Sequence, residues 1–405
     1  MSNKLKWDAS ILPYGRQWVD ADDVAAVKEA LQSNSLSDGP EITAFEDALA
    51  EATGSRFAIA VSSGTAALHL AALGLNLEAA EHVVVPAITF LATASAVRYA
   101  GVEVVFSDVD PDTGLMNELH LEAAVAGATG PVRGVFNVHL NGQCGDLPAI
   151  EQVARRHGLY VVDDACHAIG ASYGEETEQP VGSCRHCDAS VFSFHPVKTV
   201  TMGEGGAVTT NDQELRERIV FLRSHGVIRD PAAFVSHSQA FAESGEPNPW
   251  YYEMQELGFN YRASEINCVL GRSQLRKLAR FVETRRALAA RYRDVLQPFA
   301  PLVRPIAATT GCQPAWHLYP VQIDFHQVGR SRAEIMNGLR RRGIGSQVHY
   351  IPVYRHPYYR ERYGEISLPG AERYYARTLS LPIFPAMDLR DVDRVVEALC
   401  AELRI

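Results

Sequence analysis

The segment "HVVVPAITFLATASAVRYAGVEVVFSDVD", residues 82–110, sets the pattern that decides the fold. Two apolar runs, 82–90 and 102–110, flank residues 91–101, which have the composition and spacing of a helix. The apolar runs are continuous and do not alternate with polar residues, which is typical of strands buried on both faces. Strand, helix and strand in this order predict a parallel sheet covered by helices.

The same alternation continues on both sides of this segment. The sequence predicts helices at 20–33, 41–54, 64–75 and 147–158, and strands at 57–63, 133–140 and 159–165. We therefore expect an α/β fold whose large domain spans residues 1–265, with a mostly parallel sheet covered by helices.

The last third of the chain has a different pattern. Residues 264–299 read as one long helix, which we expect to bridge the large domain to a smaller one. Beyond it, short segments at 316–324, 331–345 and 346–353 precede a final helix at 389–403, and the run "YYRERYG" at 358–364 suggests an exposed, aromatic-rich loop. These features predict a smaller α+β domain over residues 266–405.

The bulk properties favour a soluble enzyme and disfavour several partners. The chain has 405 residues, 21% of them charged, and a net charge of −10, which argues against nucleic acid or an anionic membrane as the main partner. The first fifteen residues lack the apolar core of a signal peptide, and no apolar run reaches the roughly 18 residues of a membrane span, so we expect a cytoplasmic protein. Cys184 and Cys187 form a CxxC motif, but no second ligand pair accompanies it, so a metal site is not expected.

Three polar stretches follow predicted strands, where ligands bind in open parallel sheets. Ser63-Gly64-Thr65 precedes a helix and suits a phosphate, although small and hydroxyl residues are also common helix caps. Asp163 and Asp164 end a strand, where a carboxylate could bind a protonated ring nitrogen or cap a helix.

The third stretch is "SFHPVKTVTMGEGG", residues 193–206, which places Lys198 between a strand and a glycine-rich turn. A solvated surface cation is the ordinary interpretation of such a lysine, whereas a desolvated amine would be a nucleophile toward carbonyls. A phosphate cradle, a carboxylate for a ring nitrogen and a lysine for an imine together indicate pyridoxal 5'-phosphate (PLP) held as a Schiff base.

Longer segments carry a family resemblance. "PYGRQWVDADDVAAVKEAL", "DDACHAIGASYG", "VGSCRHCDASVFSFHPVK", "PWYYEMQELGFNYRASEI" and "AERYYARTLSLPIFPAM" resemble the DegT/DnrJ/StrS nucleotide-sugar aminotransferases, which have the PLP-dependent transferase fold of type I. Within that family the chain looks closest to the branch that makes the 4-amino sugar of pseudaminic acid biosynthesis. The sequence departs from the family pattern in two small ways. Asp163 stands where the family commonly has Glu, and "TVTM" after Lys198 replaces a run that more usually resembles His-Ile-Thr-Thr.

The resemblance implies roles for individual residues. Lys198 matches the lysine that binds the cofactor, Asp164 the partner of its ring nitrogen, His167 the residue beside its phenolic oxygen, and Phe90 the aromatic side chain that stacks on its ring. The remaining matches are phosphate contacts (Thr65, Ala66, Ser193 and Asn260) and residues near the substrate (Tyr14, His349 and Tyr350). Asn260 would be supplied by a neighbouring subunit, which implies a homodimer with shared active sites.

The resemblance also implies a reaction. L-Glutamate would donate its amino group to C4 of a UDP-linked 4-keto-6-deoxy-N-acetylhexosamine, through PLP. The alternatives are another nucleotide-sugar 4-aminotransferase, such as one making perosamine or acting on a D-xylo ketose, and a PLP-binding regulator without activity. Intact Lys198 and Asp164 argue against the regulator.

Overall fold

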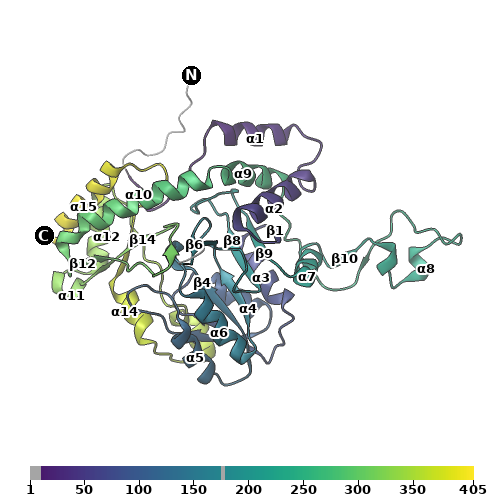
Figure 1. Ribbon diagram of the computed structural model, residues 1–405, viewed down its shortest axis with the longest axis horizontal. Coiled ribbons are helices and arrows are strands. Elements are labelled where there is room, and N and C mark those ends of the chain that lie inside the picture. Colours follow the sequence, from purple (N-terminus) through teal and green to yellow (C-terminus); the bar gives the residue numbers. More distant parts are fainter. Residues whose placement is uncertain (1–10, 175–177) are drawn as a thin grey trace.

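Seven strands form the central sheet of the computed structural model, which describes residues 11–174 and 178–405 (Figure 1). Their order across the sheet is β1 (Phe57–Val61), β9 (Gly206–Thr210), β8 (Ala189–Ser193), β5 (Tyr160–Asp164), β4 (Val132–Val138), β2 (His82–Pro86) and β3 (Glu103–Ser107). Every pairing from β8 to β3 is parallel, and only β9 runs against its two neighbours. The prediction of a mostly parallel sheet is confirmed.

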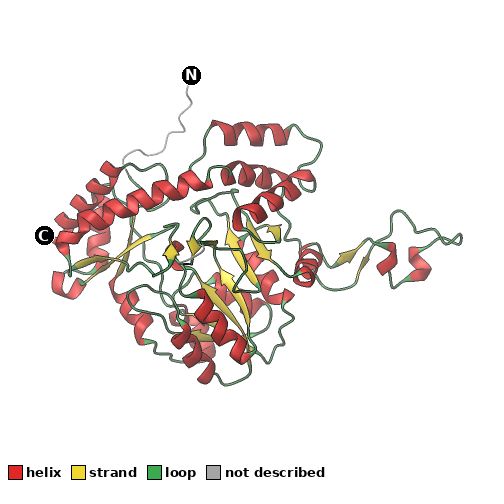
Figure 2. Cartoon of the chain, viewed as in Figure 1, coloured by secondary structure: helices red, strands yellow, loops and turns green. Residues whose placement is uncertain are grey.

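Helices cover both faces of this sheet, as Figure 2 shows. The helices of the large lobe are α1 (Ala21–Leu31), α2 (Pro40–Thr53), α3 (Gly64–Gly74), α4 (Ala92–Tyr99), α5 (Glu118–Ala126), α6 (Leu147–His157), α7 (Gln213–Arg223) and α9 (Glu265–Leu275). The three valines of β2 are buried on both faces of the sheet, which explains the continuous apolar run. Val83 and Val85 pack with α3 and α4, whereas Val84 packs in a second cluster with α5 and α6.

The sequence specifies the ends of α2 particularly well. Pro40 occupies the first turn, and Gly54 ends the helix in the left-handed conformation at φ 69°. Ile42, Phe45, Leu49 and Thr53 lie three or four residues apart and are buried, so one face of α2 packs on the lobe. This helix packs against β1 and α9.

The predicted single helix over 264–299 is wrong, because the structure has two helices there. Helix α9 ends at Leu275 and α10 (Leu278–Leu296) begins three residues later, with Lys277 at φ −104° and ψ −1° between them. The Lys277 ammonium lies 2.9 Å from the buried carboxylate of Asp23 in α1. No glycine or proline marks the break, so the sequence gives no local signal for it.

A second, smaller core forms in the C-terminal part of the chain. The antiparallel sheet β12 (Val303–Pro305), β14 (Tyr319–Ile323) and β15 (Thr378–Leu381) lies beside α10, α12 (Arg332–Arg341) and α15 (Leu389–Leu403) (Figure 1). The other elements here are α11 (Phe325–Val328), α13 (Pro357–Tyr363) and α14 (Pro369–Arg377). The part of the chain after residue 300 contains both strands and helices, as the sequence indicates, while the exact domain boundary at residue 265 stays a prediction.

Two segments differ from expectation. Residues 346–353 form no strand, and Gln347 makes only an isolated bridge to Ser380. The run 358–364 is largely exposed, as expected, but it is not a loop: residues 358–363 belong to α13, and Tyr359 is buried with its ring 5.3 Å from that of Phe106. Aromatic residues spaced four apart on a short helix produce this packed face.

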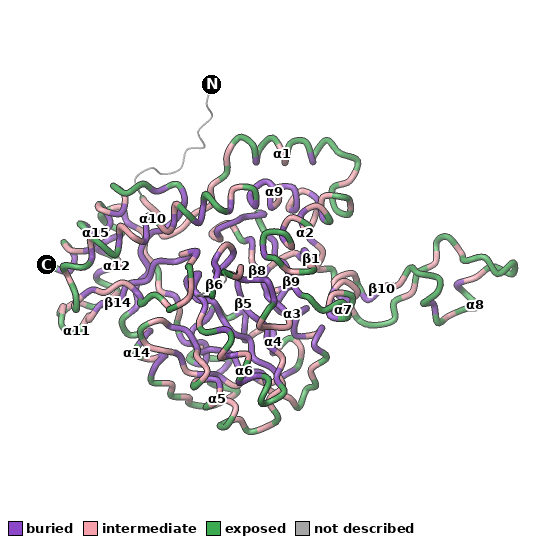
Figure 3. The backbone as a smooth tube through the Cα atoms, in the orientation of Figure 1, coloured by how far each residue is buried: buried purple, intermediate pink, exposed green. Residues whose placement is uncertain are grey.

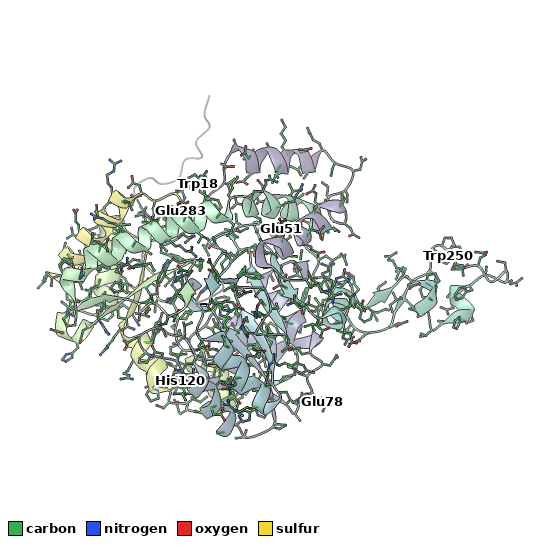
Figure 4. The ribbon with its side chains drawn as sticks, viewed as in Figure 1. Trp18, Glu51, Glu78, His120, Trp250 and Glu283 are labelled. Atoms are coloured by element: carbon green, nitrogen blue, oxygen red, sulfur yellow. The ribbon has the colours of Figure 1, made fainter. Side chains whose placement is uncertain are left out.

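An arm projects from the body of the protein between α7 and α9. It consists of the two-stranded sheet β10 (Val227–Ile228) and β11 (Glu253–Met254) with the short helix α8 (His237–Ala240) beyond it (Figures 1 and 3). Trp250, labelled in Figure 4, lies far out on this arm with 74% of its surface exposed.

Three further strand pieces complete the inventory. Strands β6 (Ser172–Tyr173), β7 (Gln179–Pro180) and β13 (Cys312–Gln313) form a small sheet that connects the two lobes.

None of the helices in the described ranges is long and apolar enough to cross a membrane. Residues 1–10, which carry much of the expectation about a signal peptide, lie outside the described residues.

Candidate active site

A cavity of about 650 Å³ opens at the carboxyl ends of the central strands. The predicted site residues that line it are Tyr14, Thr65, Phe90, Asp164, His167, Ser193, Lys198, His349 and Tyr350. These residues come from both lobes and are up to 336 positions apart between Tyr14 and Tyr350. Ala66 and Asn260 do not belong to its lining.

Lys198 follows β8 and reaches the cavity from a tight turn. Its backbone N–H donates to the carbonyl of His195 at 2.9 Å, which fixes the turn. Burial lowers the pKa of the Lys198 amine from its usual 10.5, and this effect exceeds the opposing influence of Cys166 and Asp164. A lowered pKa favours the neutral amine, the form that attacks a carbonyl and accepts a proton.

The structure separates the roles of the two adjacent aspartates. Asp164 lines the cavity, where its Oδ2 accepts a hydrogen bond from Thr93 Oγ1 at 2.6 Å and its Oδ1 accepts one from the Cys166 amide at 3.2 Å. Asp163 has its own partner, because its Oδ2 lies 3.3 Å from His139 Nε2. Successive residues of a strand point to opposite faces, so only Asp164 faces the cavity.

The Asp163–His139 pair is fully enclosed in the protein. Burial by itself would lower the pKa of His139, but the nearby carboxylate of Asp163 outweighs it and the net shift is upward. Asn137 Nδ2 also donates to Asp163 Oδ1 at 3.3 Å. Asp163 thus has His139 and Asn137 beside it within the protein, whereas the cavity carboxylate of Asp164 has no cation hydrogen-bonded to it in the described part of the chain.

The start of α3 forms a narrow cradle. Ser63 caps the helix, with its Oγ accepting the amide of Ala66 at 3.1 Å. A Cβ at Gly64 would lie 2.8 Å from the Cβ of Ser193, so only glycine allows this close approach of β8 and α3. The first amides of a helix have no acceptor within it, and those of Gly64 and Thr65 are therefore suited to an anion.

A group of buried histidines borders the other side of the cavity. His167 Nε2 and the Tyr350 hydroxyl lie 3.2 Å apart, and the His317 ring lies 4.5 Å from the His167 ring. His349 Nδ1 lies 2.8 Å from Ser380 Oγ. Burial lowers the pKa of His349 to about 3, with a further contribution from the Lys198 charge, and burial also lowers the pKa values of His167 and His317. All three are neutral near pH 7.

Two predicted contacts lie outside this geometry. The Ala66 amide donates its hydrogen bond to Ser63 Oγ. Asn260 is exposed at the base of the arm and pairs with Ser224 in an isolated bridge. The family resemblance places Asn260 at the site of a neighbouring subunit. Its distance from the cavity of its own chain does not test that role, which stays a prediction. Phe90 is 53% exposed at the cavity, with its ring 6.1 Å from that of Tyr350.

Sequence reasoning did not identify Thr93, Cys166 or His317 as parts of the site. Thr93 and Cys166 had a usable signal, because both follow predicted strands by a few residues and so lie at the ligand-binding edge of the sheet. His317 had none, because only the packing of the second lobe brings it against His167.

The residues of the cavity fit PLP. A cradle of helix amides, a carboxylate free of any bound cation and a desolvated lysine amine suit its phosphate, ring nitrogen and aldehyde respectively. His167 Nδ1 is buried without a hydrogen-bond partner, so it is available to a polar group. No group of three or more metal-ligating side chains occurs among the described residues.

Comparison with known proteins agrees with this geometry. Residues 17–400 match the model of the DegT/DnrJ/EryC1/StrS aminotransferase family. The spore coat polysaccharide biosynthesis protein SpsC of Bacillus subtilis is 37% identical over 390 residues, which cover 96% of each chain. Helicobacter pylori PseC, an aminotransferase of pseudaminic acid biosynthesis, is 29% identical with a TM-score of 0.86, covering 97% of this chain and 99% of PseC.

A third similar structure was determined in the presence of a nucleotide sugar. DesI in the presence of its TDP-sugar product is 31% identical with a TM-score of 0.82, and the match covers 98% of this chain and 94% of DesI. The family is PLP-dependent. The fold, the cavity and these matches lead to one conclusion: the chain belongs to the DegT/DnrJ/EryC1/StrS aminotransferase family of sugar-aminating enzymes.

Proposed function

We propose that this aminotransferase moves the amino group of L-glutamate to C4 of a UDP-4-keto-6-deoxy-N-acetylhexosamine. The product would be UDP-4-amino-4,6-dideoxy-N-acetyl-β-L-altrosamine, an intermediate of pseudaminic acid biosynthesis, made in the cytoplasm by a homodimer. The observation that carries the proposal is the convergence of the Lys198 amine, the Asp164 carboxylate and the first turn of α3 on one cavity.

Bound PLP supplies an aldehyde that exchanges amines and a protonated ring that accepts electrons. Asp164 would keep the proton on the ring nitrogen, and Thr93 holds the carboxylate in place for that role. Lys198 would hold the cofactor, and its amine, whose pKa burial lowers, would take a proton from the nitrogen-bearing carbon of the substrate and return one to the cofactor. The buried neutral His167 lies in the cavity wall and can hydrogen-bond an oxygen without adding charge.

The identity of the sugar rests on similarity to PseC, the pseudaminic acid aminotransferase. DesI, with its TDP-sugar product, is an equally extensive match by coverage, so the alternative is another nucleotide-sugar 4-aminotransferase. The two possibilities differ in the acceptor and share the chemistry of Lys198 and Asp164.

Separate half-reactions test the proposal. The PLP-loaded protein is converted to its pyridoxamine form with L-glutamate, and the excess donor is removed. UDP-4-keto sugars of the L-arabino and D-xylo series are then added separately while the visible absorption of the cofactor is followed. D-Glutamate in the first step is the matched control for the donor.

The proposal predicts rapid recovery of the visible band with the L-arabino ketose alone. Recovery with the D-xylo ketose alone would overturn the sugar assignment and leave a different nucleotide-sugar aminotransferase. Failure of L-glutamate to bleach the band would overturn the donor, and failure to bind PLP would overturn the whole proposal.

A further inference from the structure

Two cysteine side chains touch behind the active site. The thiol of Cys144 donates to Sγ of Cys312 with the sulfurs 3.4 Å apart, and the Cys144 amide donates to the same sulfur at 3.4 Å. Cys144 is fully buried, whereas Cys312, at the start of β13, is partly exposed. The two residues are 168 positions apart in the chain. None of the catalytic groups described above includes either sulfur.

The surroundings make the two thiols chemically different. Hydrogen bonding from Cys144 lowers the pKa of Cys312 to about 7 despite opposing burial, and the Thr309 hydroxyl and His139 lower it further. The pKa of Cys144 is raised, first by its bond to Cys312 and then by burial. Cys312 is therefore the partly exposed member of the pair and the one that ionises more readily, while Cys144 is a buried thiol directly beside it. A partly accessible cysteine of lowered pKa next to a second thiol is the arrangement found in redox-responsive cysteine pairs.

We propose that Cys312 and Cys144 are an oxidation site that forms a reversible disulfide in the presence of a hydroperoxide. The Cys312 thiolate attacks the terminal oxygen of the hydroperoxide, whose O–O bond breaks, giving a sulfenic acid and an alkoxide, which is hydroxide when the oxidant is hydrogen peroxide. The Cys144 sulfur then attacks the Cys312 sulfur, the S–O bond breaks, and the hydroxyl leaves with the Cys144 proton as water. The peroxide is reduced by two electrons and the two thiols are oxidised by the same two.

The backbone around the pair is already held in place. Thr309 Oγ1 donates to the Cys144 carbonyl at 2.8 Å, and the Ala315 amide donates to the Gly142 carbonyl at 2.9 Å. Because both chain segments are fixed side by side, the sulfurs have only to close from 3.4 Å to about 2.05 Å, the length of a disulfide bond.

The disulfide would tie the turn after β4 to the segment that precedes His317, within one hydrophobic cluster. Cys144 follows the 3₁₀ turn Leu140–Gly142 after β4, and Cys312 begins the segment that leads to His317. The His317 ring contacts His167, which lines the cavity. Oxidation would thus fix covalently the position of the histidine segment relative to the central sheet.

The other cysteines provide internal comparisons. Cys184 and Cys187 both lie near Ser190 Oγ, at 3.7 Å and 3.3 Å, and Cys184 is buried. Cys400 is partly exposed on α15, as Cys312 is on β13, and it has no second cysteine recorded in contact with it among the described residues. Cys400 is therefore the matched control for an accessible thiol without a resolving partner.

The experiment uses the full-length PLP-loaded protein, treated with hydrogen peroxide and mapped by mass spectrometry without reduction. We expect a cross-link between the peptides containing residues 144 and 312, a mass lower by two hydrogens, and reversal by dithiothreitol. In Cys144→Ser, Cys312 should instead be captured as a sulfenic acid by a dimedone-type probe. Cys400→Ser should form the cross-link as the unchanged protein does.

A second measurement does not depend on any variant. The oxidised protein should have a melting temperature higher by on the order of 5 °C, since the cross-link closes a long loop in the unfolded chain, and dithiothreitol should remove the gain. Oxidation of Cys400 before Cys312, or a cross-link confined to Cys184 and Cys187, would overturn the proposal. Neither outcome depends on which sugar the enzyme uses.

Discussion

The hydroxyl of Thr93 in α4 donates a 2.6 Å hydrogen bond to Oδ2 of Asp164 at the end of β5. Both groups are buried, and Thr93 Oγ1 lies in turn 2.8 Å from Thr89 Oγ1. The carboxylate that faces the cavity is thereby fixed in one orientation before a cofactor binds. A charged acceptor in a buried position makes this bond a strong one.

Removing this bond should weaken cofactor binding. Thr93→Val keeps the shape of the side chain and loses its hydroxyl. A hydrogen bond to a charged group contributes roughly 1.5–3 kcal/mol, and the remaining contacts of Asp164 compensate for part of that loss. We therefore expect PLP to bind about tenfold more weakly. Titration of the apoprotein with PLP, followed by quenching of protein fluorescence, measures the Kd. Thr93→Ser retains the donor and should restore binding. Equal affinity in Thr93→Val would show that Asp164 needs no support from α4.

Replacement of Lys198 should remove catalysis and leave folding intact. Lys198→Ala and Lys198→Arg are expected to lower the rate of the glutamate half-reaction by about 10³-fold or more, because the group that moves the proton is lost. Circular dichroism and the melting temperature report on the fold. Lys28→Ala, on the exposed face of α1, is the matched control. Near wild-type turnover in either Lys198 variant would refute its role.

The neutral histidines should make the protein sensitive to acid. For His349 the folded pKa of about 3 lies below the unfolded value of 6.5, so between these values the unfolded chain binds more protons. The free energy of unfolding must therefore fall as the pH drops through this interval. His349→Asn should reduce that slope by up to about 1.4 kcal/mol per pH unit, measured by urea unfolding at several pH values. His326→Asn, at an exposed site on α11, should leave the slope unchanged, and an unaltered slope in His349→Asn would contradict the prediction.

The shared active site predicted from Asn260 can be tested by mixing subunits. Lys198→Ala and Asn260→Ala chains should each be weakly active alone, the second because a phosphate contact is lost. If Asn260 serves the neighbouring subunit, a mixed dimer has one site with both residues intact. Refolding the two variants together should then recover activity above the sum of the separate preparations. No recovery, with mixed dimers confirmed by native mass spectrometry, would place Asn260 outside the partner's site.

Local patterns in the sequence were sufficient for most of the large lobe. Continuous apolar strands and capped helices specify βαβ units, and the carboxyl-edge rule then brings Thr65, Asp164 and Lys198 to one cavity. A strand after the glycine-rich turn was predicted, but the antiparallel direction of β9 was not, because a buried antiparallel strand has the same apolar composition as its parallel neighbours.

Features that depend on distant contacts could not be predicted. The break between α9 and α10 lies beside Lys277, whose charge pairs with Asp23 more than two hundred residues away. Tyr359 of α13 is buried against Phe106 of β3, which is distant in the sequence. The positions of Phe90, His349 and Tyr350 were obtained from family resemblance, since no spacing rule links residues of two lobes.

On β5, Asp163 pairs with His139 inside the protein and Asp164 faces the cavity. These separate roles limit which insertions and deletions the strand can accept. Pairing with β4 and β8 sets the strand's register, with Asp163 beside Asn137 and Ser190 and Asp164 beside Val138 and Val191. Single substitutions alter one task at a time. An insertion or deletion of one residue in β5 would exchange the two faces, turning the charge paired with His139 toward the cavity and burying the other without a partner. Insertions and deletions should therefore be confined to the loops around β5, whereas a substitution in the strand affects only the role of the residue that it replaces.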